Sequence, residues 1–423
     1  MTPTPAAIAI WVVAGLATAC VIARPFRLPE AVWAVAGAAI LLVAGLLPWA
    51  DLIRAVGKGL DVYLFLTGMM LLAETARREG VFDWVAALAV NRAGGSPRRL
   101  LLLVYGVGVV VTAFLSNDAT AVVLTPAVYA AAKQAGVKPA PYLFACAFVA
   151  NAASFVLPIS NPANLVLYGD HTPALPRWLA SFAAPSILAI LATYAVLRLA
   201  EGRGLRGACA PRVDQPALST GGRTALAGIG ATAVALTVVS VFDTPLGLPT
   251  CILGGATAVV TLVRNRESPA ALLRGVSWSV LPLVAGLFVL VEAVGRTGLT
   301  AVLAAALGRA AQVSVPAAAA GAGALLALVC NLMNNLPAGL IAGATIVQAH
   351  PPRAVVDALL IGVDLGPNLS ITGSLATILW LTALRREGES IGFWCFLKRG
   401  ALVMPPALVL AIGARLLVGR AIA

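Results

Sequence analysis

Long apolar runs, separated by short polar segments, dominate this chain. A helix that crosses the hydrocarbon core of a membrane needs roughly 20 mostly apolar residues. The runs that fit this pattern are predicted to be spans and cover residues 6–23, 31–50, 62–76, 178–198, 224–242, 246–263, 280–294 and 401–420. The first run has neither a charged start nor a small-residue cleavage site, so we expect it to be retained rather than removed as a signal peptide.

Further apolar stretches carry polar residues near their middle and do not fit simple spans. They cover residues 100–132, 139–170, 315–349 and 353–384. We expect them to alternate between a re-entrant hairpin and a broken crossing, so that each half of the chain has about five crossings and one hairpin. Hydropathy also allows a twelve-span alternative in which both hairpins cross fully. Two amphipathic stretches, 81–93 and 299–312, are predicted to lie along the membrane interface.

The chain repeats itself, with similar residues in the same order in both halves. Gly68, Glu74, Arg78 and Gly80 recur as Gly286, Glu292, Arg296 and Gly298. The segment at 116–120 aligns with 333–337, and the segment at 151–164 aligns with 364–377. We therefore predict a first repeat at 1–200, a linker at 201–223 and a second repeat at 224–423. The two pairs of aligned segments are predicted to be, in order, the hairpin tips and the broken helices.

An odd number of crossings in each half would place the second repeat upside down relative to the first. The predicted fold is thus an all-α polytopic membrane protein built from two inverted repeats. Inverted repeats with interrupted helices are the architecture of secondary transporters, whose substrate site lies near the membrane midplane.

Composition excludes several other classes of protein. Of the 423 residues, 60% are hydrophobic and 11% are charged, whereas soluble domains are about 45–50% apolar and about 25% charged. The basic residues stand apart between apolar runs, which argues against nucleic acid as a partner. Two His and six Cys without paired spacing support neither a metal centre nor a disulfide framework. We predict a transporter that is not an enzyme, needs no bound cofactor and uses the proton-motive force.

The charge distribution predicts how the chain is inserted. The net charge is +12, and if the N-terminus is outside, most of the 29 Lys and Arg residues fall in inner loops. Cytoplasmic loops of membrane proteins carry such an excess. We therefore expect a multi-pass protein of the inner (plasma) membrane, with a cytoplasmic linker and both termini outside.

The polar residues at the four breaks predict a transport chamber without Lys or Arg. Its expected substrate-binding residues are Ser116, Asn117, Asp118, Ser160, Asn161, Asn334, Asn335, Gly373, Ser374 and Thr377. Amide and hydroxyl groups suit a small neutral polyhydroxyl compound or a cation, whereas two acids argue against a dicarboxylate. Asp118 and Asp364 are predicted to exchange protons, since intramembrane acids are costly and commonly functional. The structural alternative is that these polar residues cap helix ends.

Two pairs of charged residues have helical i,i+4 spacing. Glu74 with Arg78, and Glu292 with Arg296, would each lie on one helix face. We expect each pair to be a scaffold ion pair, with a gate as the alternative.

Three segments carry a resemblance to a known family. They are SNDATAVVLTP at 116–126, NLMNNLP at 331–337 and DLGPNLSITGSLATILWL at 364–381. With this repeat layout the chain resembles the arsenite efflux permeases, the arsenical pump membrane proteins of the ion transporter superfamily. The resemblance implies export of arsenite, and often antimonite, in exchange for protons. It also implies a soluble arsenite-stimulated ATPase partner in some systems and a homodimer. An acid often stands in the family where this chain has Asn151, so Asp118 or Asp364 must carry the proton here.

The chemistry of the residues and the resemblance lead to one hypothesis. Arsenous acid is an uncharged trihydroxy compound that Asn, Ser and Thr can hydrogen-bond without charge. We expect protons to bind from outside at Asp118, Asp364 or both, and to release arsenite outward. The alternatives are a sodium/proton or other cation antiporter, a small organic-anion permease, and a channel or structural membrane protein.

Overall fold

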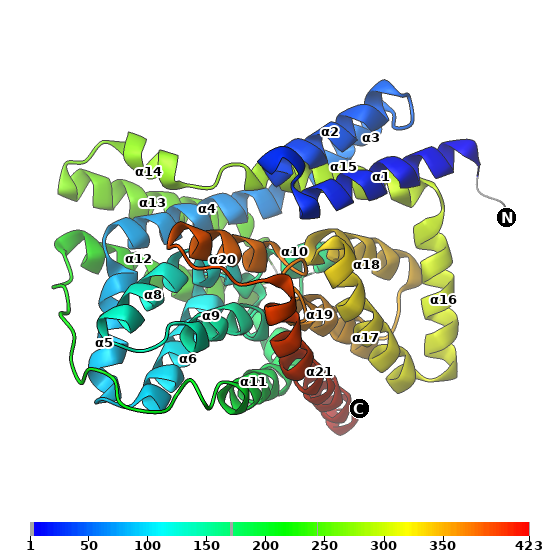
Figure 1. Cartoon of the computed structure of the whole chain (residues 1–423). Helices are drawn as coiled ribbons and strands as arrows, with labels where there is room; N and C mark the ends of the chain where they lie inside the picture. Colours follow the sequence, from blue (N-terminus) through cyan, green and yellow to red (C-terminus); the bar gives the residue numbers. More distant parts are fainter. Residues whose placement is uncertain (1–3, 170–171, 243, 423) are drawn as a thin grey trace.

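The computed structural model describes residues 4–169, 172–242 and 244–422, which form helices and loops without any strand. The helices of the first half are α1 (Pro5–Ala23), α2 (Glu30–Val43), α3 (Trp49–Lys58), α4 (Leu60–Arg78), α5 (Val81–Ala93), α6 (Pro97–Phe114), α7 (Asn117–Ala119), α8 (Thr125–Gln134), α9 (Ala140–Ala152), α10 (Pro162–Tyr168) and α11 (Leu175–Ala200). Those of the second half are α12 (Thr220–Val239), α13 (Gly247–Asn265), α14 (Pro269–Gly275), α15 (Val280–Arg296), α16 (Leu299–Val313), α17 (Val315–Met333), α18 (Asn335–Ala349), α19 (Arg353–Leu365), α20 (Leu375–Arg386) and α21 (Phe393–Ile422). Figure 1 shows their arrangement.

Among the described residues, seven helices are long and apolar enough to cross a membrane. They are α1, α6, α11, α12, α13, α17 and α21, the last over Phe393–Val418. The number rises to nine if each of two bent pairs, α3 with α4 and α14 with α15, forms one span. The prediction of an all-helical membrane protein with many spans is confirmed.

The predicted span at 31–50 is wrong in its length. Helix α2 ends at Val43, and α3 begins at Trp49 after a turn. Gly45 has a φ of 68°, a left-handed conformation that glycine adopts without strain and that ends helices. Pro48 then precedes α3 and has no backbone N–H to continue α2. One apolar run is therefore divided between two helices.

The two halves pack on each other through repeated glycines. Helix α4 packs on α13, and α15 packs on α2. The backbone of α13 at Thr250 leaves no room for a Cβ at Gly68, and Ala34 of α2 leaves none at Gly286. Small residues allow membrane helices to approach this closely. The recurrence of Gly68 as Gly286 thus reflects two equivalent contacts between the halves.

Helices α5 and α16 stand at opposite edges of the molecule, across the direction of α1, α4 and α13 (Figure 1). We call these edges the linker end, which carries α5 and residues 201–219, and the α16 end. The linker is bound there, since the amide of Cys209 donates to the carbonyl of Gly95 at 3.0 Å. One face of α5 is buried, whereas α16 buries only Thr300 and Ala304.

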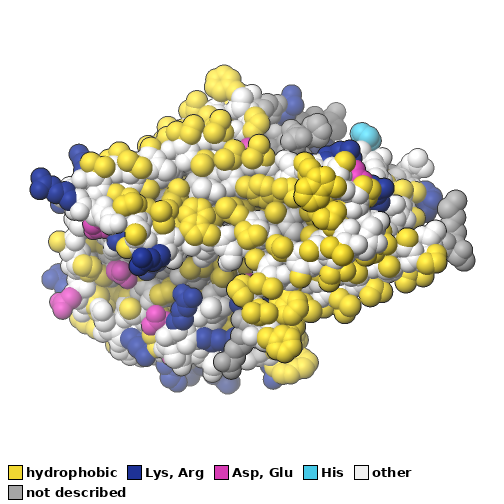
Figure 2. Space-filling model, turned by 90° about the horizontal axis from the view of Figure 1, so that it is seen from above, with side chains coloured by type: hydrophobic (Ala, Val, Ile, Leu, Met, Phe, Trp, Pro, Cys, Tyr) yellow, Lys and Arg dark blue, Asp and Glu magenta, His cyan; other side chains and the backbone are white. Residues whose placement is uncertain are grey.

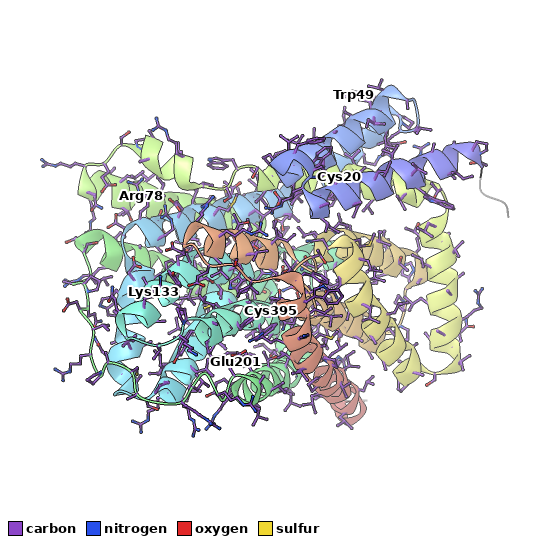
Figure 3. All side chains as sticks on the ribbon, in the orientation of Figure 1. Cys20, Trp49, Arg78, Lys133, Glu201 and Cys395 are labelled. Carbon is purple, nitrogen blue, oxygen red and sulfur yellow. The ribbon has the colours of Figure 1, made fainter. Side chains whose placement is uncertain are left out.

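Charged side chains are distributed unevenly between the two ends. Figure 2 shows Lys and Arg gathered toward the linker end, with hydrophobic side chains over the middle of the molecule. In Figure 3, Arg78 and Lys133 lie toward the linker end, and Trp49 lies far from them, beside the turn between α2 and α3. An apolar middle with a basic end is the pattern expected of a membrane protein.

Candidate functional site

Each of the four helix breaks starts a new helix with a polar residue at its N-cap. Ser116 accepts a hydrogen bond from the amide of Ala119 at 3.2 Å. Asn161, Asn334 and Ser374 accept equivalent bonds, at 3.0, 3.2 and 3.1 Å, from the amides of residues 163, 336 and 377. Such side chains satisfy backbone N–H groups that a new helix leaves free. The predicted capping role therefore applies to four of the predicted site residues.

A buried hydrogen-bond network joins the two broken helices. Asn151, at the end of α9, donates from Nδ2 to Oδ1 of Asn368 at 3.0 Å and to the hydroxyl of Thr377 at 3.4 Å. The hydroxyl of Ser374 donates to Oδ1 of Asn151 at 3.3 Å. All four side chains are fully or almost fully buried. Ser374 and Thr377 thus contact the first half of the chain through Asn151.

Asp364 is sealed inside the protein behind Asn161. The Nδ2 of Asn161 donates to its Oδ1 at 2.5 Å. Its Oδ2 has no hydrogen-bond partner among the described residues, and the residue is 0% exposed. A buried carboxylate oxygen that has no hydrogen-bond partner costs free energy.

Asp118 occupies a different position, on the wall of two adjoining cavities. The smaller cavity, of about 10 Å³, is lined by four predicted site residues, Asn117, Asp118, Asn161 and Asn335. The larger, of about 70 Å³, is lined by Ser116 and Asp118 and reaches Glu74 on α4. Both cavities share Leu66, Asp118, Pro162 and Val280. Neither is lined by a described Lys or Arg, and Asp118 is the acid that lines both.

Several predicted site residues lie outside these cavities. Ser160 donates to the carbonyl of Ala113 at 3.0 Å and braces its break against α6. The carbonyl of Gly373 accepts from the amide of Asn335 at 2.9 Å. Asn334, Ser374, Thr377 and Asp364 also line neither cavity. The structure therefore divides the predicted chamber into a cavity wall and a supporting network behind it.

Asn331 is a structural residue that the sequence analysis missed. Its Nδ2 donates to the carbonyl of Gly366 at 3.0 Å, and its Oδ1 accepts from Ser370 at 2.7 Å. The signal was an Asn inside the apolar run of α17, one turn before the hairpin tip. Polar residues at such positions satisfy backbone groups freed by a nearby helix break.

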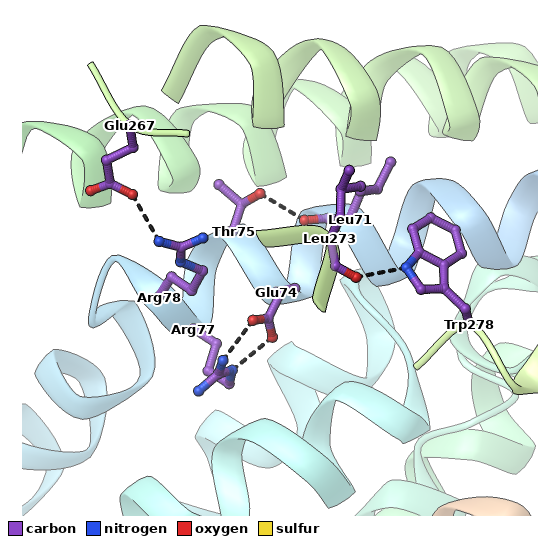
Figure 4. Close-up of polar contacts among 8 residues, drawn as sticks. All are labelled: Leu71, Glu74, Thr75, Arg77, Arg78, Glu267, Leu273 and Trp278. Atoms are coloured by element: carbon purple, nitrogen blue, oxygen red, sulfur yellow. Dashed lines mark hydrogen bonds and ion pairs between the residues drawn. The ribbon is translucent and has the colours of Figure 1, made fainter. Parts of the chain in front are cut away.

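The predicted i,i+4 ion pairs do not form. Glu74 binds Arg77 through two bonds of 2.6 and 2.7 Å, and Arg78 binds Glu267 at 2.9 Å (Figure 4). In the other half, Glu292 binds Lys58 at 2.8 Å, and Arg296 binds Asp51. Tertiary packing presents each Arg with an acid from the opposite half. Three of these pairs therefore join the two halves, and only Glu74 with Arg77 lies within a single helix.

Comparison with known proteins places the chain among membrane transporters. A family described as citrate transporter, CitMHS, matches residues 9–368. An arsenical pump membrane protein of Escherichia coli is 28% identical over 395 residues, which is 89% of this chain and 91% of the relative. One from Yersinia enterocolitica is 27% identical over 390 residues, with the same coverage. An uncharacterized transporter of Mycobacterium bovis is 25% identical over 398 residues, covering 91% and 92%.

A solved structure shares the fold. The crystal structure of the YdaH transporter of Alcanivorax borkumensis matches with a TM-score of 0.57 over 89% of this chain and 90% of that chain. Their sequences are 19% identical, so this likeness concerns the fold alone.

Proposed function

The chain belongs to the citrate transporter family, and from this premise we propose that it is a secondary active transporter that exports arsenite, and antimonite, in exchange for protons. The observation that carries the proposal is a cavity wall of Asn117, Asn161 and Asn335 around one carboxylate, Asp118. Relatives named arsenical pump membrane proteins support the same substrate.

The cavity wall fits the chemistry of arsenous acid. This compound is uncharged at neutral pH and presents three hydroxyl groups. Side-chain amides both donate and accept hydrogen bonds, and a carboxylate accepts them. A fully paired neutral solute avoids the cost of a buried charge and of an unsatisfied polar group. A described Lys or Arg, which would favour an anion, is absent from the wall.

In this proposal both acids bind protons, Asp118 in direct contact with the substrate and Asp364 through Asn161. Ionised Asp118 accepts a hydrogen bond from the substrate hydroxyl. A proton that binds at Asp118 neutralises the carboxylate, so the hydrogen bond from the substrate is no longer strengthened by the charge and arsenite is held less tightly. Asp364 acts through Asn161, because this amide bonds Asp364 and also lines the cavity. Protonation of either acid from outside would then favour release of the substrate.

The orientation proposed for this cycle places the linker end in the cytoplasm and both termini outside. Lys and Arg gather toward that end in Figure 2, which agrees with the positive-inside rule. The cavity of about 70 Å³ extends from Asp118 to Glu74 and Ser277, near the linker end. Arsenite would enter by this route from the cytoplasm.

A second candidate is transport of a small organic acid, which the family description favours. The cavity wall opposes it, because a carboxylate substrate would lie beside Asp118 without a described Lys or Arg. Repulsion between the carboxylate of the substrate and that of Asp118 would disfavour binding. The two candidates therefore predict different substrates for the same variants.

Transport into inverted vesicles tests the proposal. We expect arsenite uptake that requires a proton gradient and is lost in both Asp118→Asn and Asp364→Asn. Uptake of citrate, with no arsenite movement, would favour the second candidate. Sodium-dependent proton flux without arsenite movement would favour a cation antiporter. Arsenite uptake unchanged in both variants would exclude these acids as proton sites.

A further inference from the structure

Each end of the molecule has its own cavity, and the two are lined by equivalent elements with the halves exchanged. At the linker end, the cavity of about 70 Å³ is lined by Glu74 of α4, by Gly275 at the end of α14 and by residues 276–277 of the α14–α15 loop. At the α16 end, a cavity of about 580 Å³ is lined by Glu292 of α15 and by Lys58 at the end of α3. Glu74 and Glu292 are also equivalent in the repeat.

At the linker end, the Glu74 side chain packs against Gly275, the last residue of α14. Its carboxylate is fixed by the two bonds to Arg77 and is 6% exposed. It lies so close to Gly275 that a Cβ there would overlap Oε1. The loop is closed by the indole of Trp278, which donates to the carbonyl of Leu273 at 2.7 Å (Figure 4). The Glu74 carboxylate therefore lies against the end of α14 in the opposite half, while its hydrogen bonds stay within α4.

At the α16 end, Glu292 occupies the equivalent position and forms an ion pair with the other half. Lys58 donates to its Oε2 at 2.8 Å and joins α15 to the end of α3. Helix α3 bends into α4 by 46°, and α14 bends into α15 by 41°. Each bend lies at the mouth of one cavity. In both cases one carboxylate of a long helix lies against the end of a short helix of the other half.

Only one of the two cavities reaches the central residues. The linker-end cavity shares Leu66, Asp118, Pro162 and Val280 with the small central cavity. The α16-end cavity shares none of these and ends at Val62, Leu165 and Leu340. The centre is thus connected toward the linker end and is separated by apolar side chains from the α16 end.

We propose that Glu74 and Glu292 are the positioning residues of two matched gates, each controlling access to the central site from its own end. The proposal rests on the proposed transport function. For the site to open at one end, the loop or helix end held by that carboxylate must move away from the long helix. A charged and paired carboxylate keeps that end narrow. Loss of its charge should widen access at one end only.

Cysteine accessibility tests the proposal without any substrate. In the full chain with its six native cysteines replaced by alanine, Val122→Cys reports the linker-end cavity and Ala344→Cys the α16-end cavity. Exposed Arg212→Cys and Gln312→Cys report which end a membrane-impermeant thiol reagent reaches. We expect Glu74→Gln to speed labelling of Val122→Cys about tenfold, within the usual range of coupling between sites. Labelling of Ala344→Cys should not change.

Matched variants keep the test decisive. Glu292→Gln should speed labelling at Ala344→Cys alone. Glu79→Gln neutralises an acid at the same end of α4 that binds Asn265 and Ser219 and does not line the cavity, so it should change neither rate. If Glu74→Gln fails to fold, Gly275→Ala, which displaces the same carboxylate, should give the linker-end effect. If a variant changed the labelling rates at both ends equally, or if folded variants changed neither rate, the proposal of two gates would be wrong. Because no arsenite is used, this result is independent of the proposed substrate.

Discussion

The two hairpin tips occupy equivalent positions in the repeat but differ in how their polar groups are used. At the first tip, Asp118 lines both central cavities, and Oδ1 of Asn117 has no hydrogen-bond partner among the described residues. At the second tip, the amide of Asn335 donates to Gly373, and Nδ2 of Asn334 donates to the carbonyl of Thr372 at 3.5 Å. The first tip presents Asp118 and Asn117 to the cavity, whereas the second tip adds only Asn335 among its polar residues and is tied to its neighbouring break.

This difference shows that two similar segments of one chain can serve different purposes: one lines the cavity and the other supports the neighbouring helix break. Broken backbone inside a membrane must be satisfied by protein groups or line a cavity. The second tip meets this requirement through Asn331, Ser370 and Thr372, which bond one another and the surrounding carbonyls. With one tip held in this way, the other is free to offer Asp118 and Asn117 to a substrate. We infer that recognition is concentrated at the first tip.

The largest expected effect concerns Asp118. Asp118→Asn should reduce arsenite uptake by about a hundredfold, because hydrogen bonds to charged groups contribute about 1.5–3 kcal/mol. The matched change at the second tip, Asn335→Ala, should reduce uptake only severalfold, since it removes a neutral amide from the cavity wall and leaves the backbone bond to Gly373 in place. Initial uptake rates in inverted vesicles measure both. Equal losses in the two variants would remove the functional distinction between the tips.

An intermediate effect concerns stability. Asn331→Ala should lower the free energy of unfolding by about 2–3 kcal/mol, because it removes three hydrogen bonds of the side chain: two donated to the carbonyls of Ala327 and Gly366 and one accepted from Ser370. Asn117→Ala should cost less, since its Oδ1 has no partner to lose. Thermal unfolding in detergent compares the two. A larger loss of stability in Asn117→Ala would contradict the assignment of the second tip as the supporting one.

The smallest expected effect concerns packing behind the second tip. Gly373→Ala would place a Cβ 2.5 Å from the Cα of Pro367, so the loop must shift. Such overpacking costs about 1–3 kcal/mol. Gly106→Ala on α6, where a Cβ has open space, is the control and should leave the melting temperature unchanged or slightly raised. If Gly373→Ala were as stable as this control, the second tip would be less tightly held than its contacts indicate.

Much of the site was predictable, but its division into two layers was not. Asn117, Asp118, Asn161 and Asn335 were predicted from polar residues at the helix breaks, and the structure places all four on one cavity. Ser160, Asn334 and Gly373 carry the same sequence signal but serve as a brace, a cap and a backbone acceptor. A helix break needs polar residues both to line a cavity and to support the freed backbone. The residue type alone therefore cannot show whether a side chain faces the cavity or the backbone.

The sequence by itself determined that this is an all-helical membrane protein of many spans. Apolar length, the low share of charge and the recurrence of residues such as Gly68 as Gly286 are properties of the chain that no packing can reverse. Only the tertiary structure decided which partners the charged residues take. Helical spacing favoured Glu74 with Arg78, but the opposite half supplies Glu267 to Arg78, and Glu74 turns to Arg77. It also decided that Asp118 faces a cavity while Asp364 lies sealed behind Asn161, because burial depends on segments far apart in the chain.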